Sequence, residues 1–162
     1  MKKIFVLVGA IFLGATLSAE SGKSVGWVTA EPVARVSVAA GRAATVALRF
    51  RVADGYHINS NKPRSELLIP TELKLEAPAG VRIDTVAYPE GSEFALSFDP
   101  TEKLSVYSGE FVVTAKLSAV RGAAAGSYPL SGVLSYQACN DRACFPPKKL
   151  PVSLEVRITP AH

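Results

Sequence analysis

The sequence predicts an all-β fold, and three observations support this prediction. Apolar residues alternate with polar ones through most of the chain, which is the period of a strand with one buried face. Short clusters of Gly, Pro and Asp separate the alternating runs. Beyond the N-terminal apolar segment, no stretch has the period of a helix. Roughly eight short strands at this spacing favour an antiparallel β-sandwich of the immunoglobulin-like type.

The predicted strands follow this alternation in chain order. They lie at residues 35–38, 45–52, 72–76, 81–84, 111–118, 130–137 and 150–158. Turn signals between them lie at residues 40–41, 54–55, 78–80, 89–91 and 122–126. Pro151 indicates an edge or the first residues of a strand, because proline lacks the N–H that a central ladder position needs.

Two polar segments do not fit simple strands. Residues 55–63 are rich in turn formers, and we expect a structured loop that packs against a sheet edge, with His57 hydrogen-bonded. Residues 92–103 place Phe94 and Phe98 among Ser, Glu, Asp and Pro. These aromatics are either core residues under a long loop or a cover over another group.

The N-terminus has the pattern of a secretory signal peptide. Two lysines precede an apolar stretch, residues 4–17, and small residues then allow cleavage after Ala19 or Ser18. The apolar stretch is too short for a membrane anchor. We therefore expect residues 1–19 to be removed, and residues 20–162 to form one exported domain without stable membrane insertion.

Charge and motifs argue against several classes of function. Loss of the two signal-peptide lysines lowers the net charge from +4 to about +2. The basic residues are scattered and not interleaved with aromatics, so we expect no nucleic-acid partner. The sequence has no Gly-x-Ser-x-Gly motif and no phosphate-binding glycine loop. No pair of carboxylates stands out as catalytic, so the sequence gives hydrolase chemistry little support.

Cys139 and Cys144 are the two cysteines of the chain, and a short polar turn separates them. In an exported protein such a pair is expected to form a disulfide. A bridge across so short a loop stabilises the fold by only about 2 kcal/mol, and a domain of this size has a core that does not need it. The spacing favours a dithiol that opens and closes, with a static disulfide as the alternative. His57 could add a third metal ligand, but a second cysteine pair is missing, so we expect neither metal nor other cofactor.

The residues beside the cysteines leave their reactivity open. Arg142, Lys148 and Lys149 would favour the reactive thiolate, whereas Asp141 would oppose it. The segment Phe145-Pro146-Pro147 has few backbone donors and restricted torsions. It forms either a rigid docking rim for another protein or the end of a strand at a sheet edge.

Several motifs resemble those of a known family. The most specific are Tyr136-Gln137-Ala138-Cys139 and Cys144-Phe145-Pro146-Pro147. Supporting motifs are Gly55-Tyr56-His57-Ile58-Asn59, Leu68-Ile69-Pro70-Thr71 and Leu104-Ser105-Val106-Tyr107-Ser108-Gly109. Over about residues 27–158, the chain resembles the N-terminal periplasmic domain of the thiol:disulfide interchange protein DsbD.

This resemblance implies a periplasmic immunoglobulin-like sandwich whose cysteine pair exchanges disulfides with thioredoxin-like partners. Cys144 corresponds to the cysteine that forms mixed disulfides, and Cys139 to the resolving cysteine. Residues 92–103 correspond to a cap loop over the pair, with Phe98 as the expected cap residue and Phe94 as the second choice. The other residues expected near the site are Tyr136, Phe145, Pro146, His57 and Tyr56.

Two departures from the family bear on function. The best-known member has one more residue between its cysteines, and this chain ends at His162, without the membrane and thioredoxin-like domains of DsbD. We therefore expect a stand-alone periplasmic carrier that passes reducing equivalents through a reversible Cys139–Cys144 disulfide, of oxidoreductase type if it is an enzyme. The alternative is a secreted immunoglobulin-like protein-binding module with a static disulfide.

Overall fold

The chain forms three β-sheets. The computed structural model describes residues 26–33, 35–95, 101 and 103–161, and within these ranges it has twelve strands and no helix. The strands are β1 (Val28–Ala30), β2 (Val36–Ala39), β3 (Ala43–Val52), β4 (His57–Asn59), β5 (Glu72–Glu76), β6 (Val81–Ala87), β7 (Ser92–Ala95), β8 (Lys103–Tyr107), β9 (Glu110–Ala119), β10 (Gly126–Tyr136), β11 (Ala138–Cys139) and β12 (Lys148–Thr159). The predicted signal peptide, residues 1–19, lies outside this description. In the described part, no helix could span a bilayer.

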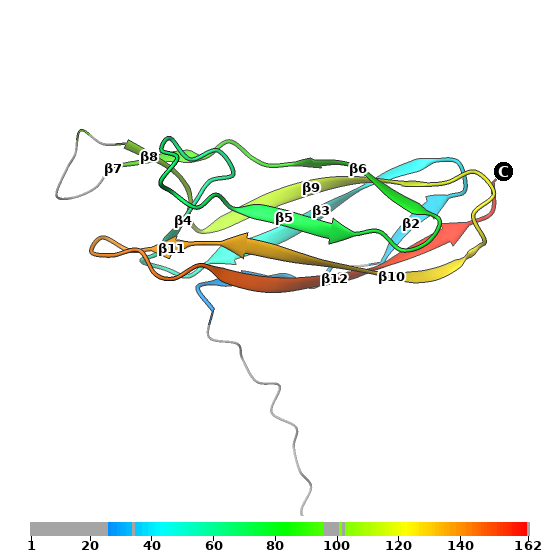
Figure 1. Ribbon diagram of the computed structural model, residues 1–162. Coiled ribbons are helices and arrows are strands. Elements are labelled where there is room, and N and C mark those ends of the chain that lie inside the picture. Colours follow the sequence, from blue (N-terminus) through cyan, green and yellow to red (C-terminus); the bar gives the residue numbers. More distant parts are fainter. Residues whose placement is uncertain (1–25, 34, 96–100, 102, 162) are drawn as a thin grey trace, which may run out of the picture.

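Two four-stranded sheets make up the body of the molecule. Their strand orders are β1-β3-β9-β6 and β2-β12-β10-β5, and Figure 1 shows their long strands running along the length of the molecule. The pairs are antiparallel, except that β2 runs parallel to the end of β12. This arrangement confirms the predicted all-β, immunoglobulin-like sandwich.

The alternation in the sequence produces the core between these sheets. On β3 every second side chain from Val46 to Val52 is buried, and on β9 the same holds from Phe111 to Ala119. The register places Phe50 opposite Phe111, and their rings stack with centroids 5.2 Å apart. Burial of such apolar side chains is the main source of stability for a sandwich.

A third, smaller sheet lies at one end of the sandwich, away from the end where β12 terminates (Figure 1). Its strand order is β11-β4-β8-β7. Strands β10 and β12 stay paired as far as Tyr136 opposite Lys148, and β11 then pairs with β4 instead. The chain therefore leaves the sandwich at Gln137 and returns at Lys148, and both cysteines lie on this excursion.

The small sheet differs from what the alternation predicted. The expected loop at residues 55–63 contains strand β4, whose three residues are all buried. Residues at both ends of the segment 92–103 belong to strands, β7 and β8. Period-two alternation missed these short strands because both faces of β4 are covered and its buried residues include polar ones. Pro151 lies at an edge, as predicted. Strand β10 pairs with one side of β12 at Pro151, whereas β2 pairs with the other side only at Val156–Thr159.

Candidate functional site

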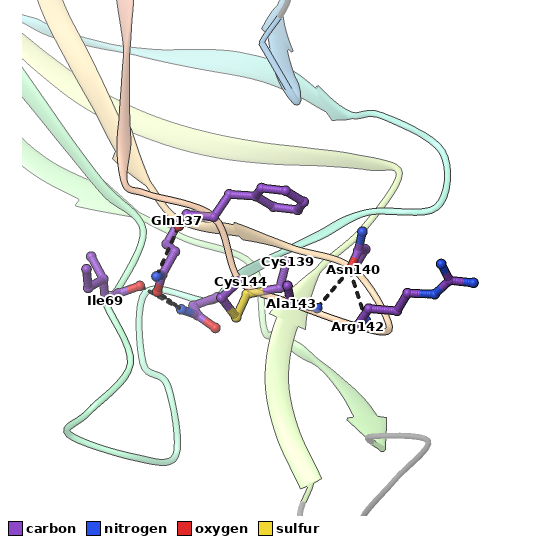
Figure 2. Close-up of a disulfide and its surroundings, with 9 residues drawn as sticks. Ile69, Gln137, Cys139, Asn140, Arg142, Ala143 and Cys144 are labelled. Atoms are coloured by element: carbon purple, nitrogen blue, oxygen red, sulfur yellow. Dashed lines mark hydrogen bonds between the residues drawn. A yellow bond between two sulfur atoms is a disulfide. The ribbon is translucent and has the colours of Figure 1, made fainter.

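Cys139 and Cys144 form a disulfide across a tight hairpin (Figure 2). Their Cα atoms are 4.0 Å apart and the two residues form an antiparallel bridge. The flanking backbone bonds run from Asn140 N–H to Ala143 O, at 2.9 Å, and from Phe145 N–H to Ala138 O, at 2.8 Å. The cysteines therefore occupy a non-hydrogen-bonded pair of the ladder, where facing side chains are closest.

The side chain of Asn140 closes the turn between the cysteines. Its Oδ1 accepts hydrogen bonds from the N–H groups of Arg142 and Ala143, each at 2.9 Å. Asparagine is favoured in such turns because its carbonyl can replace a backbone acceptor. The hairpin is thus held by hydrogen bonds that do not depend on the S–S bond.

The two sulfur-bearing residues differ in exposure. Cys139 is 2% exposed and lies on β11 within the small sheet, whereas Cys144 is exposed on the returning segment. A thiolate on another protein can approach Cys144 but not Cys139. Attack on Cys144 Sγ would expel the Cys139 sulfur as the leaving group.

A polar network fixes the segment that follows Cys144. Gln137 donates from Nε2 to Phe145 O, at 3.2 Å, and its Oε1 accepts from Asn59 Nδ2, at 3.3 Å. Asn59 Nδ2 also donates to Ile69 O, at 2.9 Å. The buried Oδ1 of Asn59 has no partner among the described residues. Figure 2 shows Ile69 and Gln137 to the left of the disulfide.

Two aromatic side chains, Trp27 and Tyr56, pack against Phe145 at the start of that segment. The ring of Phe145 lies 4.6 Å from that of Trp27 and 5.9 Å from that of Tyr56, measured between centroids. Lys148 Nζ lies over the Trp27 ring, 4.2 Å from its centroid, which is a cation–π contact. Pro146 is exposed beside Phe145. Phe145 and Pro146 directly follow Cys144 in the chain, and together with Tyr56, which packs on Phe145, they form a surface that we call the rim.

Tyr136 lies beneath this rim as a core residue. It is 2% exposed, and burial raises the pKa of its phenol, against hydrogen bonds with the backbone of Val28 and Trp27 that lower it. Its position at the end of β10 directs the chain into the hairpin. Tyr136 supports the site from below and is not accessible to a partner.

His57 lies on the strand next to Cys139. The β4–β11 register places the two residues directly opposite each other, and His57 is 2% exposed. Burial lowers the pKa of its imidazole, and the charge of Asp141 acts in the opposite direction. The expected hydrogen-bonded loop histidine is instead a strand residue, and its Nε2 has no partner among the described residues.

The structure places one of the two predicted cap residues. The ring of Phe94, on β7, lies 4.2 Å from the ring of His57 and is half-buried. Phe98, the first choice, lies outside the described residues. The described aromatic of this segment therefore covers the histidine next to Cys139.

Sequence analysis missed Trp27, Gln137 and Asn59 as parts of the site. Trp27 is the single tryptophan of the chain and stands just before β1, which could have marked it. Gln137 and Asn59 occur within the family-like motifs but carry no local signal of their contact. They are 78 residues apart in the chain, and only the pairing of β4 with β11 brings them together.

The fold and the site define an immunoglobulin-like domain that carries a disulfide with one exposed cysteine. The family model for the N-terminal domain of the thiol:disulfide interchange protein DsbD matches residues 24–155, so the chain belongs to this family. A comparison with curated protein sequences found no match.

Solved structures of DsbD and ScsB domains resemble the chain. The reduced DsbD N-terminal domain of Neisseria meningitidis is 25% identical, with a TM-score of 0.45, covering 69% of this chain and 77% of that one. The N-terminal periplasmic domain of ScsB from Proteus mirabilis is 18% identical, with a TM-score of 0.51. That match covers 78% of this chain and 44% of the ScsB chain, so it supports the fold alone. A chain in the complex of the DsbD and PilB N-terminal domains from N. meningitidis is 21% identical, with a TM-score of 0.47. That match covers 83% of this chain and 87% of the other.

Proposed function

We propose that residues 20–162 form a periplasmic thiol:disulfide exchange carrier. In this proposal, the domain passes reducing equivalents between thioredoxin-like proteins through a reversible Cys139–Cys144 disulfide. The observation that carries the proposal is the unequal exposure of the two cysteines, with Cys144 open to a partner and Cys139 buried. Membership of the DsbD N-terminal family supports the same chemistry and the periplasmic location.

Each transfer would take two exchange steps. A donor thiolate attacks Cys144 Sγ, forms a mixed disulfide, and the electron pair of the broken bond passes to Cys139; a second donor thiol then releases the reduced domain. In the opposite half of the cycle, the Cys144 thiolate attacks an oxidised partner. Cys139 then attacks Cys144, which restores the internal disulfide and frees the reduced partner. Cys144 is thus the exchanging residue and Cys139 the resolving one.

The hairpin suits a disulfide that opens repeatedly. The bridge closes a loop of only six residues, so its loss costs about 2 kcal/mol. The turn remains held by Asn140 and by the bond from Phe145 N–H to Ala138 O, neither of which involves sulfur. The domain can therefore alternate between oxidised and reduced forms without refolding.

The rim offers a surface for the partner. Phe145 and Pro146 adjoin exposed Cys144, and Phe94 lies on the side of His57. Membership of a thiol:disulfide interchange family supports a protein as partner. We propose that thioredoxin-like proteins dock on this rim and that residues 92–103 cap the disulfide between encounters.

Trapping a mixed disulfide tests the proposal. Cys139→Ser removes the resolving thiol, so this variant, incubated with a periplasmic extract, should accumulate a thioredoxin-like protein on Cys144 that dithiothreitol releases. The matched Cys144→Ser variant retains only the buried thiol and should trap none.

Two results would contradict the carrier and favour a binding module with a static disulfide. The first is the absence of any adduct on Cys139→Ser. The second is a disulfide that stays oxidised in redox buffers well below about −300 mV, as structural disulfides do.

A further inference from the structure

His57 stands in one row with the two cysteines. Cys144 bridges to Cys139, and Cys139 lies opposite His57 on β4. Residues that face each other in an antiparallel ladder project to the same side, with Cβ atoms about 4.5–5.5 Å apart. The imidazole of His57 therefore stands beside the Cys139 side chain, on the side away from Cys144.

This histidine is buried and incompletely paired. It is 2% exposed, the Phe94 ring covers it, and its Nε2 has no hydrogen-bond partner among the residues that the structure describes. An unpaired buried nitrogen costs free energy, so its presence calls for a physical reason. The neighbour in register is a cysteine that must gain and lose a proton during exchange.

The charges around His57 favour a neutral imidazole. Burial lowers the pKa of the imidazole. The negative charge of Asp141, in the hairpin turn, acts in the opposite direction. Glu93 and Phe94 are neighbours on β7, so their side chains project to opposite faces of the sheet. Glu93 forms ion pairs with Arg64 and Lys103 on the face away from Phe94 and His57. On β8, Tyr107 lies opposite Ile58, so it belongs to the other face of the sheet. At neutral pH one ring nitrogen is therefore free to accept a proton.

We propose that His57 accepts the proton of the Cys139 thiol when Cys139 resolves a mixed disulfide. This inference rests on the proposed exchange at Cys144 and adds a residue to it. The proton passes from Cys139 Sγ to His57 as the Cys139 sulfur attacks Cys144 Sγ. The Cys139–Cys144 bond forms, the bond from Cys144 to the partner breaks, and the partner leaves as a thiolate. His57 then returns its proton to solvent.

A neutral base beside the thiol has a kinetic signature. Without a base, resolution depends on the thiolate fraction, so its rate rises about tenfold per pH unit below a thiol pKa of about 8.5. With His57 as general base, the proton leaves during the attack, so the rate follows the amounts of thiol and neutral imidazole, which change little between the two pKa values. The resolution rate should then be nearly flat from about pH 6.5 to about pH 8.

The aromatic disulfide dithiobis(nitrobenzoate) can separate the two steps. Reduced protein should release one coloured thiolate when Cys144 attacks the reagent, and a second when Cys139 resolves the adduct. In wild type, the second phase should be flat with pH. In His57→Gln, which has a polar side chain of similar size without a basic nitrogen, it should rise about tenfold per pH unit and be about 100-fold slower at pH 6.5.

Controls separate proton transfer from packing. Ser60→Ala removes the contact between Ser60 Oγ and Ser105 Oγ, at 2.9 Å, next to β4, and should keep the flat profile. A cooperative urea transition reports whether His57→Gln is folded, and the first phase, which belongs to Cys144, should match wild type. If that variant does not fold, His57→Asn replaces it.

A steep wild-type second phase, or identical profiles in wild type and His57→Gln, would overturn the role of His57. Neither result bears on the proposed carrier function, which is tested by adduct trapping on Cys139→Ser and by the reducibility of the disulfide. The two proposals can therefore fail separately.

Discussion

The long-strand sandwich and the small end sheet bury different kinds of residue. The sandwich core is apolar, with Leu48, Val113 and Leu134 fully buried. Among the described residues, the buried polar side chains gather around β4. His57 and Asn59 lie on this strand and Ser60 follows it. Thr71 donates a hydrogen bond from Oγ1 to Asn59 O. The sandwich thus supplies stability, whereas the end sheet positions polar groups around a disulfide. If this division holds, stability and exchange should respond to different mutations.

The largest effect on stability is expected in the sandwich. Phe50→Ala removes a ring that is 1% exposed and stacks on Phe111. The free energy of unfolding, measured by urea titration, should therefore fall by about 3–5 kcal/mol. The reagent kinetics of the fraction that remains folded should match wild type. Leu67→Ala, at a side chain that is 93% exposed, serves as control and should change stability by less than about 0.5 kcal/mol. Altered resolution kinetics in Phe50→Ala would show that the two regions are coupled.

Reduction of the disulfide should have a smaller effect. Oxidised and reduced wild type should differ by about 2 kcal/mol in urea unfolding, because the bridge constrains only a six-residue loop. The reduced form should keep a cooperative transition, since the Asn140 bonds remain. A reduced protein that is unfolded in buffer would mean that the bridge holds the fold, contrary to the carrier proposal.

The end sheet should also give stability a pH dependence. Burial lowers the pKa of His57 below its ordinary value of 6.5, so between the two pKa values the unfolded chain binds more protons than the folded one. This contribution is complete above about pH 6.5 and is lost as pH falls through that window, by at most about 1.4 kcal/mol per pH unit. Urea titrations across this range should show a shallower decline for His57→Gln than for wild type. Equal declines would mean that His57 is as easily protonated folded as unfolded.

The same division explains what could be predicted from the sequence. Strands β3, β9, β10 and β12 bury one face each, so their alternation is visible in the sequence, and their prediction is confirmed. Strand β4 is buried on both faces, and His57 and Asn59 on one of them are polar, so no period marks it. Family-like motifs pointed to His57 and Tyr56, but the contact of His57 with Phe94 arises from strand pairing over long separations. The roles assigned to Cys139, Cys144 and the cap remain predictions.

The contact between Lys148 and Trp27 joins the two regions and gives the smallest expected effect. Lys148 begins β12, Trp27 precedes β1, and the Trp27 ring in turn packs on Phe145 beside Cys144. Lys148→Gln removes the cation and should lower stability by about 0.5–1 kcal/mol, measured by urea unfolding. The adjacent Lys149→Gln removes an equal charge from an exposed position and should change stability less. If the two variants are equally destabilised, the loss reflects net charge. A larger loss in Lys148→Gln would show that the aromatic rim contributes to stability as well as to the surface around the exposed cysteine.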